Sequence, residues 1–328
     1  MSSVKEVAQR ADVSVATVSR VLNNDPTVKT LNRNKVLKAI EELNYKPNML
    51  AKSLRKKASF TIVLVMSSMS NPFYAGIVKG ANEAVRNSGY KVIIGTTDAN
   101  EREWETYETM LSTSQADGIV IISSCANKKI VSQLNDRYPV VMCNEYFDGL
   151  NLTYVSIDNK KAGYDAAKEL LSRGCRHIVY VAGSKDSSSV KDRMAGYKEA
   201  LGEAGIPFQD KLVLQPKKGY GQMKDMINEL VQAGVPVDGI ITHSDMHASY
   251  ILKGIKDGAV LLDEKVGIIS FDGTYVAEIT NPALTSITQP AYELGHSAVQ
   301  LLLQKIQQQE INQSKRLIVE HRLVKRET

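Results

Sequence analysis

The sequence predicts an α/β protein with a three-helix N-terminal head, a hinge helix and two similar, doubly wound parallel α/β halves. Apolar residues recur at helical spacing over the first 45 residues. From residue 61, strand-like apolar runs alternate with amphipathic helices, and one pattern of that alternation occurs twice. With 328 residues the chain is too long for one compact core, so several domains are expected.

Two short helices joined by a tight turn are predicted within residues 4–22. Ser14 stands where the N-cap of the second helix is expected. A third helix is predicted within residues 36–48, ending near Asn44 before Pro47. The side chains expected to close this small core are Val4, Val7, Ala8 and Ala11, then Val15, Val18, Val21 and Leu22, then Val36, Leu37, Ile40 and Leu43.

This pattern is typical of a helix-turn-helix, although an ordinary helical hairpin has the same periodicity. Ala16, Thr17, Ser19 and Arg20 are short or basic residues, as in a helix that enters a major groove. Residues 1–60 hold twelve Lys or Arg and five Asp or Glu, net +7, whereas the other 268 residues hold 29 and 31, net −2. A basic head on a near-neutral body favours binding to nucleic-acid phosphates, and a solvated basic face is the alternative.

A hinge is expected over residues 48–60. Apolar positions at helical spacing, ending at Leu54, lie among four cations in nine residues, and a helix of this length is marginal in isolation. Against DNA and a partner subunit it would order, with Lys52 and Arg55 along phosphates and Leu54 wedged between base pairs of the minor groove. A flexible basic linker is the alternative.

The strongest internal observation from residue 61 onward is a repeat. Similar segments return in the same order at offsets of 116, 121 and 127, so two similar parallel halves follow one another. The paired segments are 80–89 with 196–205, 117–122 with 238–243, and 139–146 with 266–273.

Ligands of open parallel sheets bind beyond the carboxyl ends of the strands, so two facing halves predict a cleft with a binding site. Aromatic rings, an arginine and carboxylates there suit a hydroxyl-rich ring such as a sugar or nucleoside. Asp245 belongs either to this set or to the cap of the next helix. The expected site residues are Asn71, Phe73, Tyr74, Asp98, Ser123 and Glu145, then Ser189, Arg193, His243, Ser244 and Asp272; Ser68, Asn144, Ser187 and Ser188 are further candidates.

Enzymatic chemistry, a cofactor and a metal are not expected. The sequence lacks a GxxxxGK[ST] loop, a GxGxxG after a strand and a GxSxG elbow. His243, Asp245 and His247 have a spacing reminiscent of metal ligands, but residues two apart at a strand-to-helix junction need not converge.

The cysteine pattern and the absence of targeting signals favour a cytoplasmic protein, associated with the nucleoid when bound to DNA. Cys125, Cys143 and Cys175 are widely spaced beside strand-like segments, so buried thiols are expected. No apolar run approaches the roughly 20 residues that span a bilayer, and the N-terminus lacks the apolar core of a secretory signal.

Several motifs along the whole chain carry a family resemblance. They are VKEVAQRADVSVATVSRVLN, AIEELNYKPN, AKSLR, NPFYAGIVKG, SIDNKKAG, DRMAGYKEAL, FDG and LTSITQPAYELG. With them the chain resembles transcription regulators of the lactose/galactose repressor family. The resemblance implies a homodimer that reads a palindromic operator, hinge helices that bend the DNA, and a periplasmic-binding-protein-like body whose small effector changes operator affinity. A solute-binding protein without a DNA role is the alternative.

The resemblance also assigns roles to single residues. Val15, Ala16 and Arg20 fall where the family reads bases, and Leu54 falls on the minor-groove wedge. Phe73, Arg193 and Asp272 fall on effector contacts. The full expected DNA-binding set is Ser14, Val15, Ala16, Thr17, Ser19, Arg20, Asn23, Asn32, Lys52, Leu54 and Arg55.

Some positions depart from the family pattern. Asp12 replaces a turn glycine and can still adopt a left-handed conformation at modest cost. Lys29 and Asn32 replace Ser and Thr at the third helix, and Lys52 replaces a hinge arginine, losing its planar fork. NEY at 144–146 and HSD at 243–245 are similar to the cytidine-responsive branch of the family, which points to a nucleoside; a sugar remains the other candidate. The expected domains are 1–47, 48–60 and 61–328, the last divided into 61–157 with 290–317 and 158–289 with 318–328.

Overall fold

The computed structural model describes most of the chain as two compact units, Met1–Ala58 and Ser59–Thr328. No helix in the described part is long and apolar enough to cross a membrane. The described residues are 2–22, 25–45, 58–97, 102–122, 127–183, 187–216, 219–308 and 314–328.

The first unit is a three-helix head. Ser3 and Glu6 form a capping box at the start of the first helix, and the Ser14 hydroxyl accepts a hydrogen bond from the Thr17 amide at 3.1 Å, as an N-cap does. The helices are α1 (Val4–Arg10), α2 (Val15–Leu22) and α3 (Thr30–Glu42). Their buried core consists of Val7, Ala8, Ala11, Val18, Val21, Val36 and Ala39.

Three details of the head differ from or refine the sequence prediction. Helix α3 begins at Thr30 rather than at residue 36, because Lys29 provides no side-chain cap that would have marked its start. The prediction that Leu37 and Val15 lie in the core is wrong, because these residues are 52% and 40% exposed. Asp12 has φ +52°, which confirms the left-handed turn expected without glycine.

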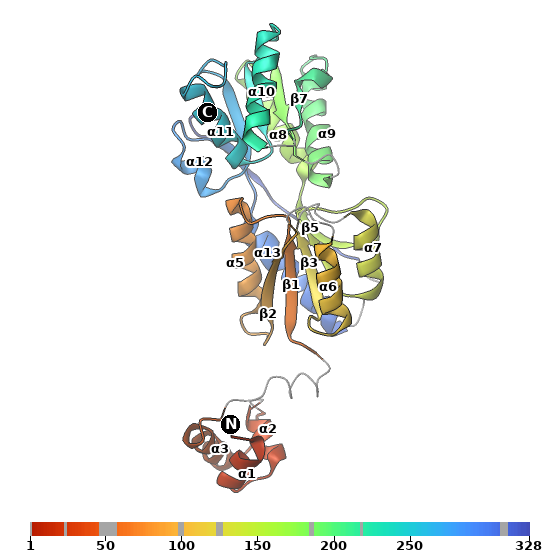
Figure 1. Ribbon diagram of the computed structural model, residues 1–328, viewed down its shortest axis with the longest axis vertical. Coiled ribbons are helices and arrows are strands. Elements are labelled where there is room, and N and C mark those ends of the chain that lie inside the picture. Colours follow the sequence, from red (N-terminus) through yellow and green to blue (C-terminus); the bar gives the residue numbers. More distant parts are fainter. Residues whose placement is uncertain are drawn as a thin grey trace. The chain divides into compact units, whose positions relative to one another are not determined.

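The second unit contains two six-stranded sheets (Figure 1). We call the first sheet with its helices the first lobe, and the second sheet with its helices the second lobe. The first sheet has the order β11-β5-β4-β3-β1-β2 and is parallel throughout. Its strands are β1 (Thr61–Met66), β2 (Lys91–Thr96), β3 (Gly118–Ile122), β4 (Val140–Cys143), β5 (Thr153–Ile157) and β11 (Arg316–Val319).

The second sheet repeats this order as β12-β10-β9-β8-β6-β7, with only β12 antiparallel to its neighbour among the described strands. The strands of the second sheet are β6 (Ile178–Val181), β7 (Val213–Leu214), β8 (Gly239–Thr242), β9 (Gly267–Asp272), β10 (Thr285–Thr288) and β12 (Arg322–Val324). Strands and helices alternate in both lobes, which confirms the predicted doubly wound fold.

Helices cover both faces of each sheet (Figure 1). Along β1, Ile62 and Leu64 enter the core beneath α5 and α13, whereas Val63 and Val65 enter the core beneath α6 and α7. Because both faces are buried, the strands read as continuous apolar runs. The helices are α5 (Pro72–Val85), α6 (Glu103–Ser112), α7 (Lys128–Arg137) and α13 (Ala291–Gln308), then α8 (Asn159–Ser172), α9 (Ser188–Glu203), α10 (Gly219–Gln232), α11 (Asp245–Lys256) and α12 (Tyr275–Ile279), with a 3-10 turn at Asp210–Leu212.

The sequence repeat has a physical explanation in these helices. Gly80 of α5 lies against α13, and a Cβ there would be 1.9 Å from the Tyr292 carbonyl oxygen. Gly196 of α9 lies against α8, and a Cβ there would be 1.9 Å from the Lys160 carbonyl oxygen. The paired Gly89 and Gly205 follow these two helices with positive φ angles. Each glycine therefore has the same backbone role in both lobes.

The repeated aspartates also have equal roles. Asp117 precedes β3, and its carboxylate accepts hydrogen bonds from the Ser59 and Phe60 amides at 2.7 and 2.9 Å. Asp238 precedes β8 and accepts from the Arg176 and His177 amides at 2.8 and 2.7 Å. In each lobe this carboxylate holds the segment that enters the neighbouring strand, β1 or β6.

The chain crosses between the lobes three times. The crossings follow β5, β10 and β11, so α13 and β11 return to the first lobe after the second lobe has begun. The last crossing follows Val319, two residues beyond the boundary expected from sequence. Cys143 and Cys175 are free and buried, which confirms that expectation for both; Cys125 lies outside the described residues.

Gly196→Ala tests the close approach of α8 and α9. The added methyl group would force the two helices apart, so we expect a loss of about 1–3 kcal/mol in the free energy of unfolding. Gly202→Ala on the same helix is the matched control, because no atom lies within 4 Å of the Cβ position there, and it should cause no loss. Urea unfolding of both variants checks this expectation, and equal losses would contradict it.

Candidate functional site

The head presents one side of α2 to solvent. Val18 and Val21 are buried, whereas Val15, Ala16 and Arg20 are exposed, so they can contact another molecule without unfolding the core. Thr17 and Ser14 are joined through their hydroxyl groups at 2.9 Å. Ser19 and Asn32 are half-buried. Of the other predicted DNA-binding residues, Asn23, Lys52, Leu54 and Arg55 lie outside the described residues.

In the second unit, the carboxyl ends of the two sheets meet across the lobes. Asn71 begins α5 in the first lobe, where its Oδ1 accepts from the Phe73 amide at 2.9 Å. Its Nδ2 donates to Asp272 Oδ2 at 2.9 Å, in the second lobe. Gln289 Nε2 donates to the other oxygen, Asp272 Oδ1, at 2.8 Å. One buried carboxylate therefore joins the end of β9 to α5 and to the segment after β10.

Both the backbone conformation and the pKa of Asp272 are unusual. Its φ of +104° is a left-handed conformation for a residue with a side chain. Burial raises the pKa of Asp272 to about 7, and the negative charge of Asp245 adds to this rise. The hydrogen bond from Asn71 opposes it, followed by the charge of Arg193. The charge of this carboxyl group therefore changes within the neutral pH range.

A second buried carboxylate joins the lobes in the opposite direction. Glu145 follows β4 in the first lobe, and we call its partners Ser187, Ser188 and Ser189 at the start of α9 the serine cluster. Their three hydroxyl groups donate to Glu145 at 2.5, 2.6 and 2.6 Å, and the Ser189 amide donates at 3.1 Å. Glu145 thus lies at the N-terminal end of α9, where a negative charge is stabilised.

Tyr146 adds two further contacts between the lobes. Its amide donates to the Ser188 hydroxyl at 3.0 Å, and its hydroxyl donates to Asp192 at 2.7 Å. Burial raises the pKa of Tyr146, and the hydrogen bond to Asp192 raises it further. The Tyr146 ring stacks on Tyr154 with centroids 4.9 Å apart.

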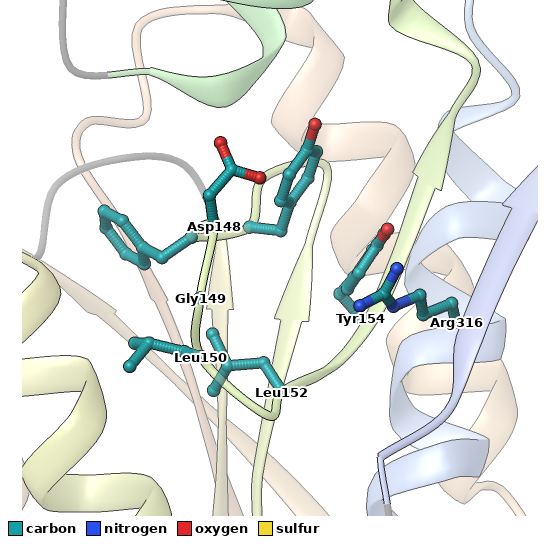
Figure 2. Close-up of a pocket in the computed structure, with 8 residues that line it drawn as sticks. Asp148, Gly149, Leu150, Leu152, Tyr154 and Arg316 are labelled. Carbon is teal, nitrogen blue, oxygen red and sulfur yellow. The ribbon is translucent and has the colours of Figure 1, made fainter.

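A small cavity of about 50 Å³ lies beside Tyr146 (Figure 2). Figure 2 shows Arg316 next to the Tyr154 ring, and the guanidinium carbon is 5.9 Å from the ring centroid. The cavity is too small for a sugar or a nucleoside, so it is not the main site. Its lining consists of Tyr146, Phe147, Asp148, Gly149, Leu150, Leu152, Tyr154 and Arg316.

Arg193 is a buried cation on α9. Its Nε donates to Asn159 Oδ1 at 2.9 Å, its Nη1 donates to the His243 carbonyl oxygen at 3.4 Å, and its guanidinium carbon lies 4.0 Å from the Phe271 ring centroid. Burial lowers the pKa of Arg193, yet a guanidinium group stays protonated in proteins. The charge is therefore fixed in place at the ends of β8 and β9.

The described residues around His243 do not form a metal site. The His243 and His247 rings lie 4.2 Å apart, and burial lowers the pKa of both, so they are neutral at pH 7. Ser244 caps α11 and pairs with His247 Nδ1 at 2.8 Å. The alternative in which Asp245 caps that helix is wrong: its carboxylate accepts from Ser270 at 2.5 Å and from the Thr274 amide at 2.6 Å. Among the described residues no three metal-ligating side chains converge.

Two other predicted effector contacts, Phe73 and Tyr74, lie in or against the core of the first lobe. Phe73 is buried in the core under α5, and Tyr74 is half-buried next to it with ring centroids 5.9 Å apart. Asp98 and Ser123 lie outside the described residues. Sequence reasoning missed Asn159 and Gln289, which orient Arg193 and Asp272. Their positions within two residues of the ends of β5 and β10, inside the motifs SIDNKKAG and LTSITQPAYELG, could have marked them.

Several buried polar atoms at the strand ends lack a hydrogen-bond partner within the described part of the chain. They follow or end β2, β4, β8 and β10, the ends at which a ligand of a parallel sheet is expected. A buried polar atom without a partner is costly, so these atoms indicate a place for a polar ligand. They are Thr97 Oγ1, Asn144 Oδ1, His243 Nδ1, Thr288 Oγ1 and Gln289 Oε1.

Comparison with known proteins decides the family. Residues 3–48 match the family of bacterial regulatory proteins called the lacI family, and residues 59–327 match the family described as periplasmic binding proteins and sugar binding domain of LacI family. The chain belongs to the LacI family. It is a sequence-specific DNA-binding transcriptional regulator with an effector-binding domain.

Relatives of this LacI-family regulator cover nearly its whole length. It is 31% identical to the transcriptional regulator RegA of Clostridium saccharobutylicum, over 100% of this chain and 99% of RegA. It is 30% identical to the transcriptional repressor CytR of Escherichia coli K12, over 97% and 93% of the two chains. A solved complex of the regulator CelR with cellobiose is 29% identical, with a TM-score of 0.74 over 99% of each chain.

The raised pKa of Asp272 predicts a pH-dependent stability. The pKa is about 7 in the folded protein and about 3.9 in an unfolded chain, so this group favours folding most below pH 4, and that contribution is lost as the pH rises towards 7. Asp272→Asn cannot ionise, so its stability relative to wild type should increase from pH 4 to pH 7. Urea unfolding at both pH values measures the difference.

The control is Asp225→Asn, which replaces an exposed carboxylate on α10. Asp272→Asn should show a larger increase in relative stability between the two pH values than this control. An equal change in the two variants would contradict the ionisation argument.

Proposed function

We propose that this regulator is a homodimeric repressor whose α2 helices read a palindromic operator, and that a nucleoside or sugar bound between the lobes changes its operator affinity. The observation that carries the effector proposal is the set of unpaired buried polar atoms at the facing strand ends. The exposed face of α2 supports the DNA proposal.

On DNA, Val15, Ala16 and Arg20 are the proposed base contacts. The two small side chains let α2 approach the bases, and a major-groove arginine pairs with guanine through two hydrogen bonds. Asn32 is the proposed phosphate contact of α3. The hinge residues Lys52, Leu54 and Arg55 remain predictions from sequence, with Leu54 as the minor-groove wedge.

Between the lobes, Asp272, Arg193, Glu145 and His243 are the proposed effector-binding residues. Carboxylates accept hydrogen bonds from ring hydroxyls, and Arg193 fixes orientation. The cellobiose complex of CelR supports a sugar, whereas the NEY and HSD segments support a nucleoside. Tyr74, Asp98 and Ser123 remain contacts predicted from sequence.

An effector hydroxyl that pairs with Asp272 would replace Asn71 as its partner. Because Asn71 also caps α5, that exchange would change the relation between the first and second lobes. A ligand shifts such an equilibrium only by its different affinity for the two arrangements. Both induction and corepression are compatible with this coupling.

Exposed apolar residues support the homodimer. Ile93 and Ile94 lie on β2, an edge strand, and Tyr250, Tyr275 and Ile279 lie on α11 and α12. Apolar residues on an edge strand and a helix pair are typical of surfaces that another subunit covers. We propose no catalytic activity, and as a DNA-binding regulator the protein would act in the cytoplasm. The basic head disfavours a solute-binding protein without a DNA role.

Arg20→Ala tests base reading. An operator is first selected from random DNA with the wild-type protein, and the variant should then lose about 1–3 kcal/mol of operator affinity and relax specificity at one base position. Lys38→Ala, which removes an exposed cation of α3, should keep the base preference. An unchanged preference in Arg20→Ala would exclude the proposed contact, and selected sites without two-fold symmetry would exclude the dimer on DNA.

Arg193→Lys tests the effector site. Lysine keeps the charge and loses the planar fork, so the effector concentration needed to change operator affinity should rise at least about tenfold, while affinity without effector stays the same. The effector for this test is the compound that most raises the unfolding temperature of the wild type in a panel of nucleosides, pentoses and hexoses.

Arg176→Lys is the matched control for this experiment. Arg176 donates to the Leu171 and Cys175 carbonyl oxygens at the amino end of β6, away from the strand ends of the proposed site. It should keep the effector response. A normal response in Arg193→Lys would contradict the proposed role, and loss of its circular dichroism spectrum would assign Arg193 to folding.

A further inference from the structure

The carboxylate of Glu145 fills a position that would otherwise suit an anion. Glu145 is 5% exposed, and both of its oxygens face the serine cluster. Three hydroxyl donors and one backbone amide at the start of a 16-residue helix make the kind of environment that binds phosphate groups. In this protein the helix N-terminus is satisfied by a side chain of the other lobe.

The unpaired atoms nearby give an independent indication of the ligand. Asn144, directly before Glu145, has an unpaired Oδ1, and Gln289, which is 4% exposed, has an unpaired Oε1. Amide oxygens only accept hydrogen bonds, so they need a ligand that donates. The hydroxyl groups of Thr97 and Thr288 pair with a donor equally well. A phosphate dianion has acceptor oxygens and no proton to donate.

The charge of Arg193, which burial disfavours, is already offset by the carboxylates of Asp272, Glu145 and Asp192 around it. Arg193 is engaged by Asn159, by the His243 carbonyl oxygen and by the face of Phe271. His243 and His247 are neutral because burial lowers their pKa values. Among the described residues, an anionic group entering here would therefore meet the carboxylates of Glu145 and Asp272 with the single charge of Arg193 to offset them.

We propose that Glu145 makes the interlobe site selective for an uncharged, hydroxyl-rich effector and excludes its phosphorylated form, because the Glu145 carboxylate already occupies the anion-binding position of the serine cluster. This inference rests on the proposed effector site and narrows its ligand class. Sugars and nucleosides are accepted, whereas sugar phosphates and nucleotides are rejected.

The first experiment removes the carboxylate and uses inorganic phosphate as the probe. Full-length wild type and Glu145→Ala are compared by isothermal titration calorimetry at constant ionic strength. Glu145→Ala should bind phosphate at least about tenfold more tightly than wild type, and Ser188→Ala in the same background should remove the gain. Phosphate binding of equal strength in wild type, or no gain in Glu145→Ala, overturns the proposal.

Glu145→Ser provides a second variant, whose short side chain removes the carboxylate and leaves the anion-binding position open. If circular dichroism shows that Glu145→Ala is not folded, the phosphate titration is made with Glu145→Ser, and the same direction of change is expected. An unchanged phosphate affinity in a folded Glu145→Ser overturns the proposal.

The second experiment uses matched pairs of probes in thermal unfolding of the wild type: ribose and ribose 5-phosphate, cytidine and cytidine 5′-monophosphate, glucose and glucose 6-phosphate. Any pair that stabilises the protein should do so through its uncharged member. Stabilisation at lower concentration by a phosphorylated member overturns the proposal. If no pair stabilises the protein, the proposed effector class fails, while the phosphate titration still decides the role of Glu145.

Discussion

Hydrogen bonds to two buried carboxylates, Glu145 and Asp272, hold the two lobes against each other. Glu145 belongs to the first lobe and accepts from the serine cluster of the second, whereas Asp272 belongs to the second lobe and accepts from Asn71 of the first. Each lobe thus supplies one carboxylate that accepts hydrogen bonds and the donors for the carboxylate of the other lobe. A ligand with hydroxyl groups can compete for the same acceptors, so ligand binding and lobe arrangement depend on one set of atoms.

Helix caps bring these groups together. Because the sheets are parallel, helices begin where strands end, and the capping residues Asn71, Ser187 and Ser244 all lie at that edge. Asn71 uses one side-chain atom to cap α5 and the other to reach Asp272. The hydroxyl of Ser187 likewise accepts from the amide of Val190 and donates to Glu145. Residue types that begin helices therefore also join the lobes, and local structure places the interlobe contacts without additional loops.

Much of this arrangement could be predicted from the sequence, because it depends on local patterns. The apolar run at 61–66 has the same bounds as strand β1. The repeated glycines and aspartates mark equal backbone roles in both lobes. What could not be predicted depends on tertiary neighbours. Leu37 has the right spacing for the core but is more than half exposed, and Phe73 follows a strand end yet its ring is buried in the core. Asn159 and Gln289 gain their roles only from the side chains that they orient.

The three crossings between the lobes also affect how the protein is made. Helix α13 and strand β11, from the last forty residues, complete one face and one edge of the first sheet, where Leu294 and Leu302 are buried. The first lobe therefore cannot bury its core while only its N-terminal strands have left the ribosome. The second lobe likewise lacks β12 until residues 322–324 are made. Although the lobes begin one after the other in the sequence, both are completed only when residues 291–324 have been made.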